Sequence, residues 1–145
     1  MEIRRICNKD LIDVTKLVTD VFMEFEAPDY SEDGVNAFFD TAINNPDFMN
    51  NLTIYGAYIK NELVGVIATR SKGNHIALFF VDGAHHRQGI GRKLFEMVLE
   101  NSTSNEITVN SSPYARSIYH HLGFENTDEE KIVTGIRFVP MIFRK

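Results

Sequence analysis

Six residues near the middle of the chain, Arg87-Gln88-Gly89-Ile90-Gly91-Arg92, have the composition of an anion-binding turn. An apolar run, 76–81, precedes them, and an amphipathic segment, 93–100, follows. A strand, a glycine turn and a helix in this order expose backbone N–H groups at the positive end of the helix dipole. Glycine lets backbone approach a ligand closely, and arginine pairs with phosphate oxygens. The pattern therefore predicts a cradle for phosphate or pyrophosphate.

Two common nucleotide-binding motifs do not fit this turn. The dinucleotide fingerprint requires a third glycine at the position of Leu94. The P-loop requires Gly-Lys-Ser/Thr, whereas Gly91 is followed by Arg92 and Lys93. The ligand is therefore expected to be a phosphate compound bound in another way.

Other reactive side chains carry weaker signals. The pairs His85-His86 and His120-His121 lack the spacing of metal ligands, so we expect no metal and place Arg87 and His86 near the phosphates. Cys7 has no identifiable activating base, so we expect a small buried residue rather than a nucleophile.

The elements that must position these residues follow from hydrophobic periodicity and turn signals. A mixed α/β fold is predicted, in which Asp10 caps the first helix, Ser31 begins the second and Pro46 follows its end. Pro140 predicts an edge or a bulge in the last strand. The strands are expected at 2–6, 52–59, 63–70, 75–81, 106–110, 131–133 and 138–143, and the helices at 11–25, from 31, within 82–101 and at 115–122.

Length and composition indicate one globular domain, 1–145, with 43% hydrophobic and 24% charged residues. A net charge of −5 argues against nucleic acid as a partner. No apolar run approaches membrane-spanning length and no signal-peptide pattern is present, so we expect no membrane partner. The single cysteine fits a reducing, cytoplasmic location.

A second motif, in residues 109–124, makes the chain similar to a known family. Together with the glycine turn, the spacing of Ala115, Tyr119 and Leu122-Gly123-Phe124 resembles the Gcn5-related N-acetyltransferases (GNAT), over roughly residues 52–143. The turn departs from the family pattern at His86, where Gln or Arg is usual. The resemblance implies a single-domain, mixed but mostly antiparallel sheet with a splayed central gap, flanked by about four helices. It also implies acetyl-coenzyme A as acyl donor.

The resemblance further implies roles for individual residues. The strand containing Phe79, Phe80 and Val81 would carry a bulge and run beside the pantetheine arm, with a backbone N–H near Phe80 or Val81 facing the thioester carbonyl. Tyr119 would be the general acid for the departing sulfur, or a packed residue whose hydroxyl binds the cofactor. Asn110 would bind the cofactor or a water molecule. Ser111 and Ser112 are expected to cap a helix rather than to act in catalysis.

The general base and the acceptor are less well specified. Ile107 or Thr108 stands where the family often has a glutamate, so the base would be a relayed water or one of Glu24, Glu26 and Asp82. In this family the connection at 24–33 often borders the acceptor cleft, and here it holds five acids and no base. Glu24 and Glu26 would thus attract a cationic amine, such as a polyamine, an aminoglycoside or a lysine-like group; the alternative is a solvated loop.

Two classes of function remain open. The first is an N-acetyltransferase that acts on a primary amine of a small molecule or peptide. The second is a coenzyme A-binding module without catalysis, acting as a sensor or scaffold. A homodimer is also possible, through an apolar C-terminal segment, 138–143, that we expect to be exposed.

Overall fold

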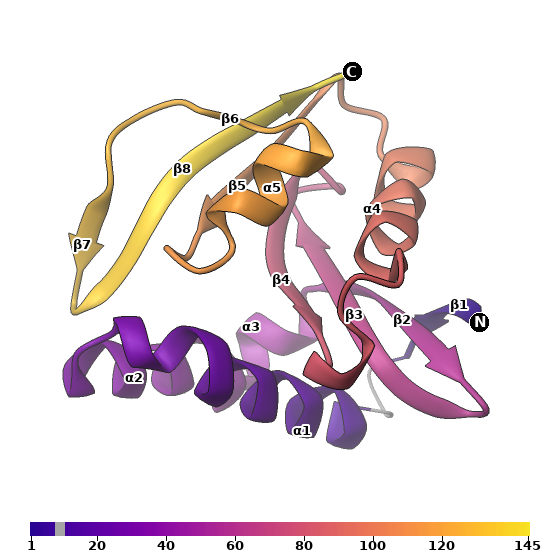
Figure 1. Ribbon diagram of the computed structural model, residues 1–145, viewed down its shortest axis with the longest axis horizontal. Coiled ribbons are helices and arrows are strands. Elements are labelled where there is room, and N and C mark those ends of the chain that lie inside the picture. Colours follow the sequence, from indigo (N-terminus) through magenta and orange to yellow (C-terminus); the bar gives the residue numbers. More distant parts are fainter. Residues whose placement is uncertain (8–10) are drawn as a thin grey trace.

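The computed structural model describes residues 1–7 and 11–145, and its centre is a twisted sheet (Figure 1). The strands lie in the order β1-β2-β3-β4-β5-β8-β6, and β7 pairs with the rest of β8. The strands are β1 (Glu2–Ile6), β2 (Thr53–Ile59), β3 (Glu62–Arg70), β4 (His75–Val81), β5 (Glu106–Ser111), β6 (Glu125–Asn126), β7 (Lys131–Val133) and β8 (Ile136–Arg144). The α-helices are α1 (Leu11–Val21), α2 (Glu32–Phe38), α3 (Pro46–Asn50), α4 (Ile90–Asn101) and α5 (Arg116–Leu122).

The sheet opens between β4 and β5, as predicted. These strands are parallel and pair only at His75 with Thr108 and at Ile76 with Val109, whereas the other pairings are antiparallel. Beyond Ile76 the two strands diverge (Figure 1). The pairing of β4 with β3 also shifts by one residue at Ala77, which confirms the expected bulge.

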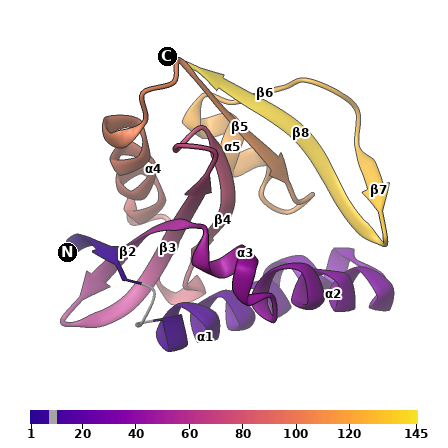
Figure 2. The same cartoon turned by 180° about the vertical axis from the view of Figure 1, so that it is seen from behind.

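Helices cover both faces of the sheet and enclose two separate cores. Figure 2 shows α1, α2 and α3 on one face, with α4 and α5 behind the sheet. The bulge decides which core each β4 side chain enters. Ile76 and Phe79 pack in the core beneath α4 and α5, whereas Ala77, Leu78 and Phe80 pack in the core beneath α1 to α3. The extra residue thus reverses the alternation of the strand at the point where the gap begins.

Irregular turns interrupt the first helical layer. A π-helical turn, η2 (Phe22–Glu26), and a 3₁₀ turn, η3 (Ala27–Asp29), continue α1, and a second π-helical turn, η4 (Phe39–Ile43), continues α2. The sequence predicted about four helices, but five α-helices occur among the described residues. The additional helix is α3, because Pro46 is tolerated in a first helical turn and Asn45 accepts a hydrogen bond from the backbone N–H of Phe48 at 3.2 Å. Asp10 lies outside the described residues.

Two local predictions about burial are wrong. Cys7 is exposed, because it follows the end of β1 and Ile6 occupies the last buried position. The C-terminal segment is not exposed, because β8 pairs with β5 on one side and with β6 and β7 on the other, which buries Val139, Met141 and Ile142. It therefore offers no free apolar strand for a dimer.

Pro140 lies neither at the sheet edge nor at a bulge. Its carbonyl accepts a hydrogen bond from the backbone N–H of Thr127 at 2.9 Å. In a strand, the N and the carbonyl of one residue point to the same side. The missing N–H of Pro140 therefore faces the short connection between β6 and β7, and pairing with β5 is unaffected.

The hairpin of β7 and β8 rests on the start of α2. Thr134 and Gly135 form its turn with positive φ angles of 52° and 79°. A Cβ atom on Gly34 would overlap the carbonyl of Gly135, so the two backbones approach as only glycine allows. Ser31 caps α2 as predicted, accepting a hydrogen bond from Gly34 N at 3.2 Å. Arg137 Nη1 donates to the carbonyl of Asp29 at 3.0 Å and holds the hairpin in place.

Candidate active site

The glycine turn has the conformation expected of an anion cradle. Gly89 precedes α4 with a left-handed φ of 80°, and a Cβ there would meet nothing within 4 Å. No side chain caps α4 and its first turn contains no acidic residue, so its first N–H groups have no capping side chain as a partner. Arg87 also has a positive φ, of 63°, which is unusual for a side chain of this size. The Cβ direction of Gly91 points at the ring of Phe79, 3.4 Å away.

Two side chains of this region, His86 and Arg92, make hydrogen-bond contacts with backbone carbonyl groups of the protein itself. His86 Nε2 lies 2.7 Å from the carbonyl oxygen of Val81, and its ring packs against Phe25 at a centroid distance of 4.9 Å. Arg92 Nη2 donates to the carbonyl of His121 at 3.1 Å, at the end of α5. His86 therefore fixes the turn to β4 instead of extending toward phosphate, and Arg92 ties α4 to α5.

A cavity of about 680 Å³ lies beside this turn. Most of the predicted cofactor residues line it, whereas Gln88 and Asn110 do not. The lining residues are Val21, Glu26, Phe79, Phe80, Val81, His85, His86, Arg87, Gly89, Ile90, Gly91, Arg92, Tyr114, Ala115, Ser117, Ile118, Tyr119, His121 and Leu122.

Backbone groups of β4 face the gap at alternate residues. The N–H of Asp82 donates to the carbonyl of Val64 in β3 at 2.8 Å. Because backbone polar groups alternate sides along a strand, those of Phe80 also face β3 and those of Phe79 and Val81 face the gap. The contact between His86 and the Val81 carbonyl agrees with this assignment. Of the two donors considered from the sequence, Phe80 and Val81, only Val81 has its N–H directed into the gap.

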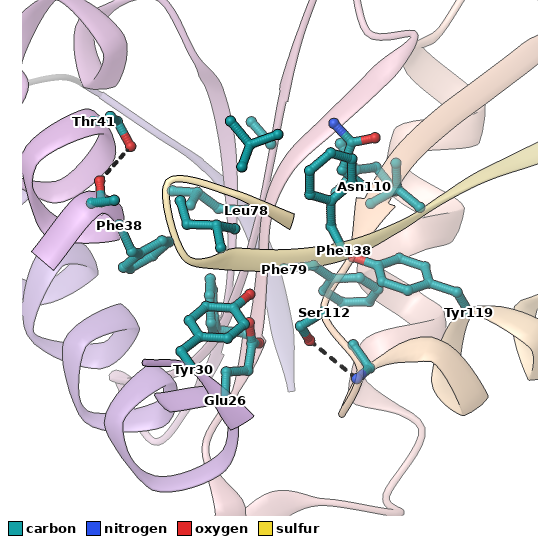
Figure 3. A pocket seen from close by; sticks show the side chains of 18 of the residues that line it. Glu26, Tyr30, Phe38, Thr41, Leu78, Phe79, Asn110, Ser112, Tyr119 and Phe138 are labelled. Atoms are coloured by element: carbon teal, nitrogen blue, oxygen red, sulfur yellow. Dashed lines mark hydrogen bonds between the residues drawn. The ribbon is translucent and has the colours of Figure 1, made fainter. Parts of the chain in front are cut away.

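A second cavity, of about 420 Å³, lies on the other side of the gap (Figure 3). Residues of α2, η4 and the β7–β8 hairpin form its outer wall, and Asn110 lines it together with β4. The lining residues are Glu26, Tyr30, Ala37, Phe38, Thr41, Ile76, Ala77, Leu78, Phe79, Phe80, Val109, Asn110, Ser112, Ala115, Tyr119, Val133, Thr134, Ile136 and Phe138.

The two cavities share part of their lining, at the point where β4 and β5 separate. Five residues belong to both cavities: Glu26, Phe79, Phe80, Ala115 and Tyr119. A carboxyl group and a phenol therefore stand between a space beside the glycine turn and a space beneath the hairpin. Such an arrangement suits a transfer between two molecules that enter from opposite sides.

Tyr119 is held firmly at this junction. It is 5% exposed, and its ring lies edge-on to Phe79 and Phe124, with centroid distances of 5.8 and 5.2 Å. Ser112 positions the start of α5, because its Oγ accepts a hydrogen bond from Ala115 N at 3.2 Å. Burial, and then the negative charge of Glu26, raise the pKa of Tyr119 above its ordinary value. The phenol therefore stays protonated.

Glu26 is the carboxyl group that the structure brings to the junction. Burial raises its pKa from 4.5 to about 7; the Ser112 hydroxyl lowers it and the charge of Asp29 raises it further. Glu26 ends the π-helical turn η2, a feature often found at functional sites. Glu24 is exposed and lines neither cavity, and Asp82 instead accepts a hydrogen bond from Ala84 N at 3.3 Å. The sequence marked Glu26 only as one acid among several.

Metal and membrane sites find no support in residues 1–7 and 11–145. No group of three or more His, Cys, Asp and Glu side chains there could hold a metal ion. His120 Nε2 lies 2.9 Å from Asn126 Oδ1, and His121 Nδ1 lies 2.7 Å from the carbonyl of Ser117. None of the helices in the same part of the chain has the length and apolar character needed to cross a bilayer.

Several solved structures have a fold similar to that of this chain. A GCN5-related N-acetyltransferase from Rhodopseudomonas palustris, also described as a class-II aminotransferase, superposes with a TM-score of 0.85, 16% identity and coverage of 99% of this chain and 95% of its own. The PaiA N-acetyltransferase of Thermoplasma acidophilum, solved with coenzyme A, superposes with a TM-score of 0.79 and 17% identity, and the match covers 99% of this chain and 98% of its own. An aminoglycoside 6'-N-acetyltransferase, also solved with coenzyme A, superposes with a TM-score of 0.65 and 12% identity, and the match covers 99% of this chain and 97% of its own. No curated protein sequence matches. The family model of the acetyltransferase (GNAT) domain matches residues 26–145, and the chain therefore belongs to the GNAT acetyltransferase family.

Proposed function

We propose that this protein transfers the acetyl group of acetyl-coenzyme A to a primary amine. The observation that carries the proposal is the meeting of two cavities at Glu26 and Tyr119. A module that only binds coenzyme A needs the larger cavity, whereas an acetyltransferase also needs a space for the acceptor. The structure holds both spaces, which favours the enzyme over the non-catalytic alternative.

The larger cavity is proposed to bind the acyl donor. The N–H groups at the start of α4 and the exposed side chain of Arg87 suit a pyrophosphate. The gap-facing backbone of Phe79 can pair with an amide of the pantetheine arm as a neighbouring strand would. The N–H of Val81 would then stabilise the charge that develops on the thioester oxygen during attack.

Tyr119 is proposed to donate a proton, or a hydrogen bond, to the departing sulfur. An ordinary thiol has a pKa of about 8.5, below that of the buried phenol, so complete proton transfer from Tyr119 is uphill. Hydrogen bonding to the sulfur as the carbon–sulfur bond breaks is therefore expected to supply most of its effect. Loss of the hydroxyl should slow turnover without abolishing it.

Glu26 is proposed to accept the proton of the attacking amine. With a pKa of about 7 it is partly ionised at neutral pH, which suits a general base. An alkylammonium with a pKa of about 10.4 would also be attracted by the carboxylate, and burial would lower its pKa toward that of Glu26. The ammonium first loses one proton to water. The neutral amine then attacks, the nitrogen–carbon bond forms, the carbon–sulfur bond breaks, and Glu26 takes the remaining proton from the nitrogen. The sulfur leaves as a thiolate that accepts a hydrogen bond from Tyr119.

A thermal-shift titration tests this function at its first step. A ligand of the native state raises stability by RT ln(1 + [L]/Kd). We expect acetyl-coenzyme A to stabilise the protein, with ATP and NAD as controls that do not. Thiol release on addition of amines then tests the transfer. Absence of a shift with acetyl-coenzyme A would overturn the proposal, and a shift without thiol release from any amine would favour the non-catalytic module.

A further inference from the structure

The smaller cavity has an apolar wall beyond its junction with the larger one. The side chains of Phe38, Leu78, Ile136 and Phe138 line it, together with the ring of Tyr30 (Figure 3). They come from α2, β4 and β8, and therefore surround the space on several sides. Apolar side chains of this kind gain free energy by covering an apolar ligand and offer nothing to a charged one.

Two of the hydroxyl groups that line the cavity are already engaged by the protein. Thr41 Oγ1 donates to the carbonyl of Ala37 at 2.7 Å, and Ser112 Oγ accepts from Ala115 N at 3.2 Å. A ligand with many hydroxyl groups would lose its hydration along the apolar wall, because Phe38, Leu78 and Phe138 offer it no hydrogen bonds. The wall therefore disfavours a sugar-like acceptor.

Charge is confined to one end of the cavity. The residues that line the smaller cavity all belong to the described part of the chain. Among them Glu26 has the only carboxyl group, and there is no Lys, Arg or His. The other acids of the 24–33 segment line neither cavity: Glu24, Asp29, Glu32 and Asp33. A second ammonium group would be buried without a carboxylate partner, which is costly.

On the basis of the proposed acetyl transfer, we propose that the acceptor is an apolar primary monoamine, with one ammonium group and an aryl or branched alkyl body. The ammonium group binds at Glu26, beside Tyr119, and the body fills the space between Phe38 and Phe138. The volume of about 420 Å³ suits a small amine with a ring. This differs from the polycationic acceptors that the acidic segment suggested from sequence.

The first test compares amines in a thiol-release assay with acetyl-coenzyme A. We expect kcat/KM for 2-phenylethylamine to exceed that for spermidine and for kanamycin by about tenfold or more. The reason is that each of the latter amines would bury at least one ammonium group without a carboxylate partner. Calorimetric titration of the same amines into the protein with coenzyme A gives a readout independent of turnover and should show the same order. Tighter binding and faster turnover of spermidine or kanamycin would overturn the inference while leaving acetyl transfer intact. No turnover of any amine would instead refute the proposed function.

Substitutions at Thr41 and Phe138 test which residues determine the acceptor specificity. Thr41 lies across the cavity from Tyr119 (Figure 3), so Thr41→Asp places a second carboxylate at the apolar end. It should shift the ratio of kcat/KM toward spermidine by about tenfold relative to Thr41→Val, which removes the same hydroxyl without adding charge. Phe138→Ala should lower kcat/KM for 2-phenylethylamine by about tenfold more than kcat/KM for ethylamine, because only the larger body contacts the lost ring. Thermal melts with acetyl-coenzyme A establish that each variant is folded. Unchanged ratios in folded variants would show that the acceptor does not occupy this cavity.

Discussion

Replacing Glu26 by glutamine tests the electrostatic basis of the proposed site. In the native protein the pKa of Glu26 is raised from 4.5 to about 7, chiefly by burial. Between these values the native state keeps a proton that the unfolded chain releases, so this group makes stability fall as the pH rises. At 1.36 kcal/mol per pKa unit, the loss reaches about 3 kcal/mol by pH 8. Glutamine has nearly the same shape and does not titrate.

The assay is urea unfolding of both proteins at a series of pH values from 4 to 8. Other titrating groups affect both proteins alike, so the difference in free energy of unfolding isolates Glu26. The variant should match the wild type near pH 4 and exceed it by up to about 3 kcal/mol at pH 8. A difference that does not change with pH would refute the raised pKa, and with it the reasoning that burial prepares this carboxyl group as a base.

The same substitution has a kinetic signature. If Glu26 accepts the amine proton, kcat/KM of the wild type should rise with pH through about 7, and the variant should lose this rise together with much of its activity. The stabilisation by acetyl-coenzyme A should remain in the variant, because the carboxyl group is not proposed to hold the donor. A rise at the same pH in both proteins would assign the base to another group or to water.

Further substitutions test the other parts of the site and the packing of the β7–β8 hairpin on α2. Tyr119→Phe should lower kcat by about tenfold to a hundredfold with little change in affinity for acetyl-coenzyme A, and unchanged kcat would remove its role as acid. Gly89→Asp should weaken acetyl-coenzyme A binding by about tenfold or more through charge repulsion. Gly73→Asp is its control, because Gly73 has a similar φ of 86° and lines neither cavity, so equal weakening in both variants would count against the cradle. Gly34→Ala should lower the melting temperature, because its Cβ would overlap the Gly135 carbonyl, even though alanine favours a helix by about 1 kcal/mol; stabilisation would refute that contact.

Much of the fold was predictable because its signals are local. The glycine turn between an apolar strand and an amphipathic helix is defined by neighbours in sequence, and it forms as expected around Gly89. The same holds for the strands at 53–59, 62–70 and 75–81, whose apolar residues and flanking turns are adjacent in sequence. Local signals were insufficient at two prolines, whose role depends on neighbouring segments. Pro46 can follow one helix or begin another, and Pro140 can lie within an inner strand at the point where the neighbouring strand β6 ends.

The sequence by itself determined the family and the residue types at the glycine turn and at Tyr119. Tertiary structure alone decided that Glu26, and not Glu24 or Asp82, reaches the junction, because only Glu26 among these three acids lines the two cavities. It also decided the character of the second cavity, whose walls come from residues as distant as Phe38 and Phe138. A turn depends on the conformation of adjacent residues, whereas a cavity and a burial-induced pKa depend on which distant segments meet when the chain folds.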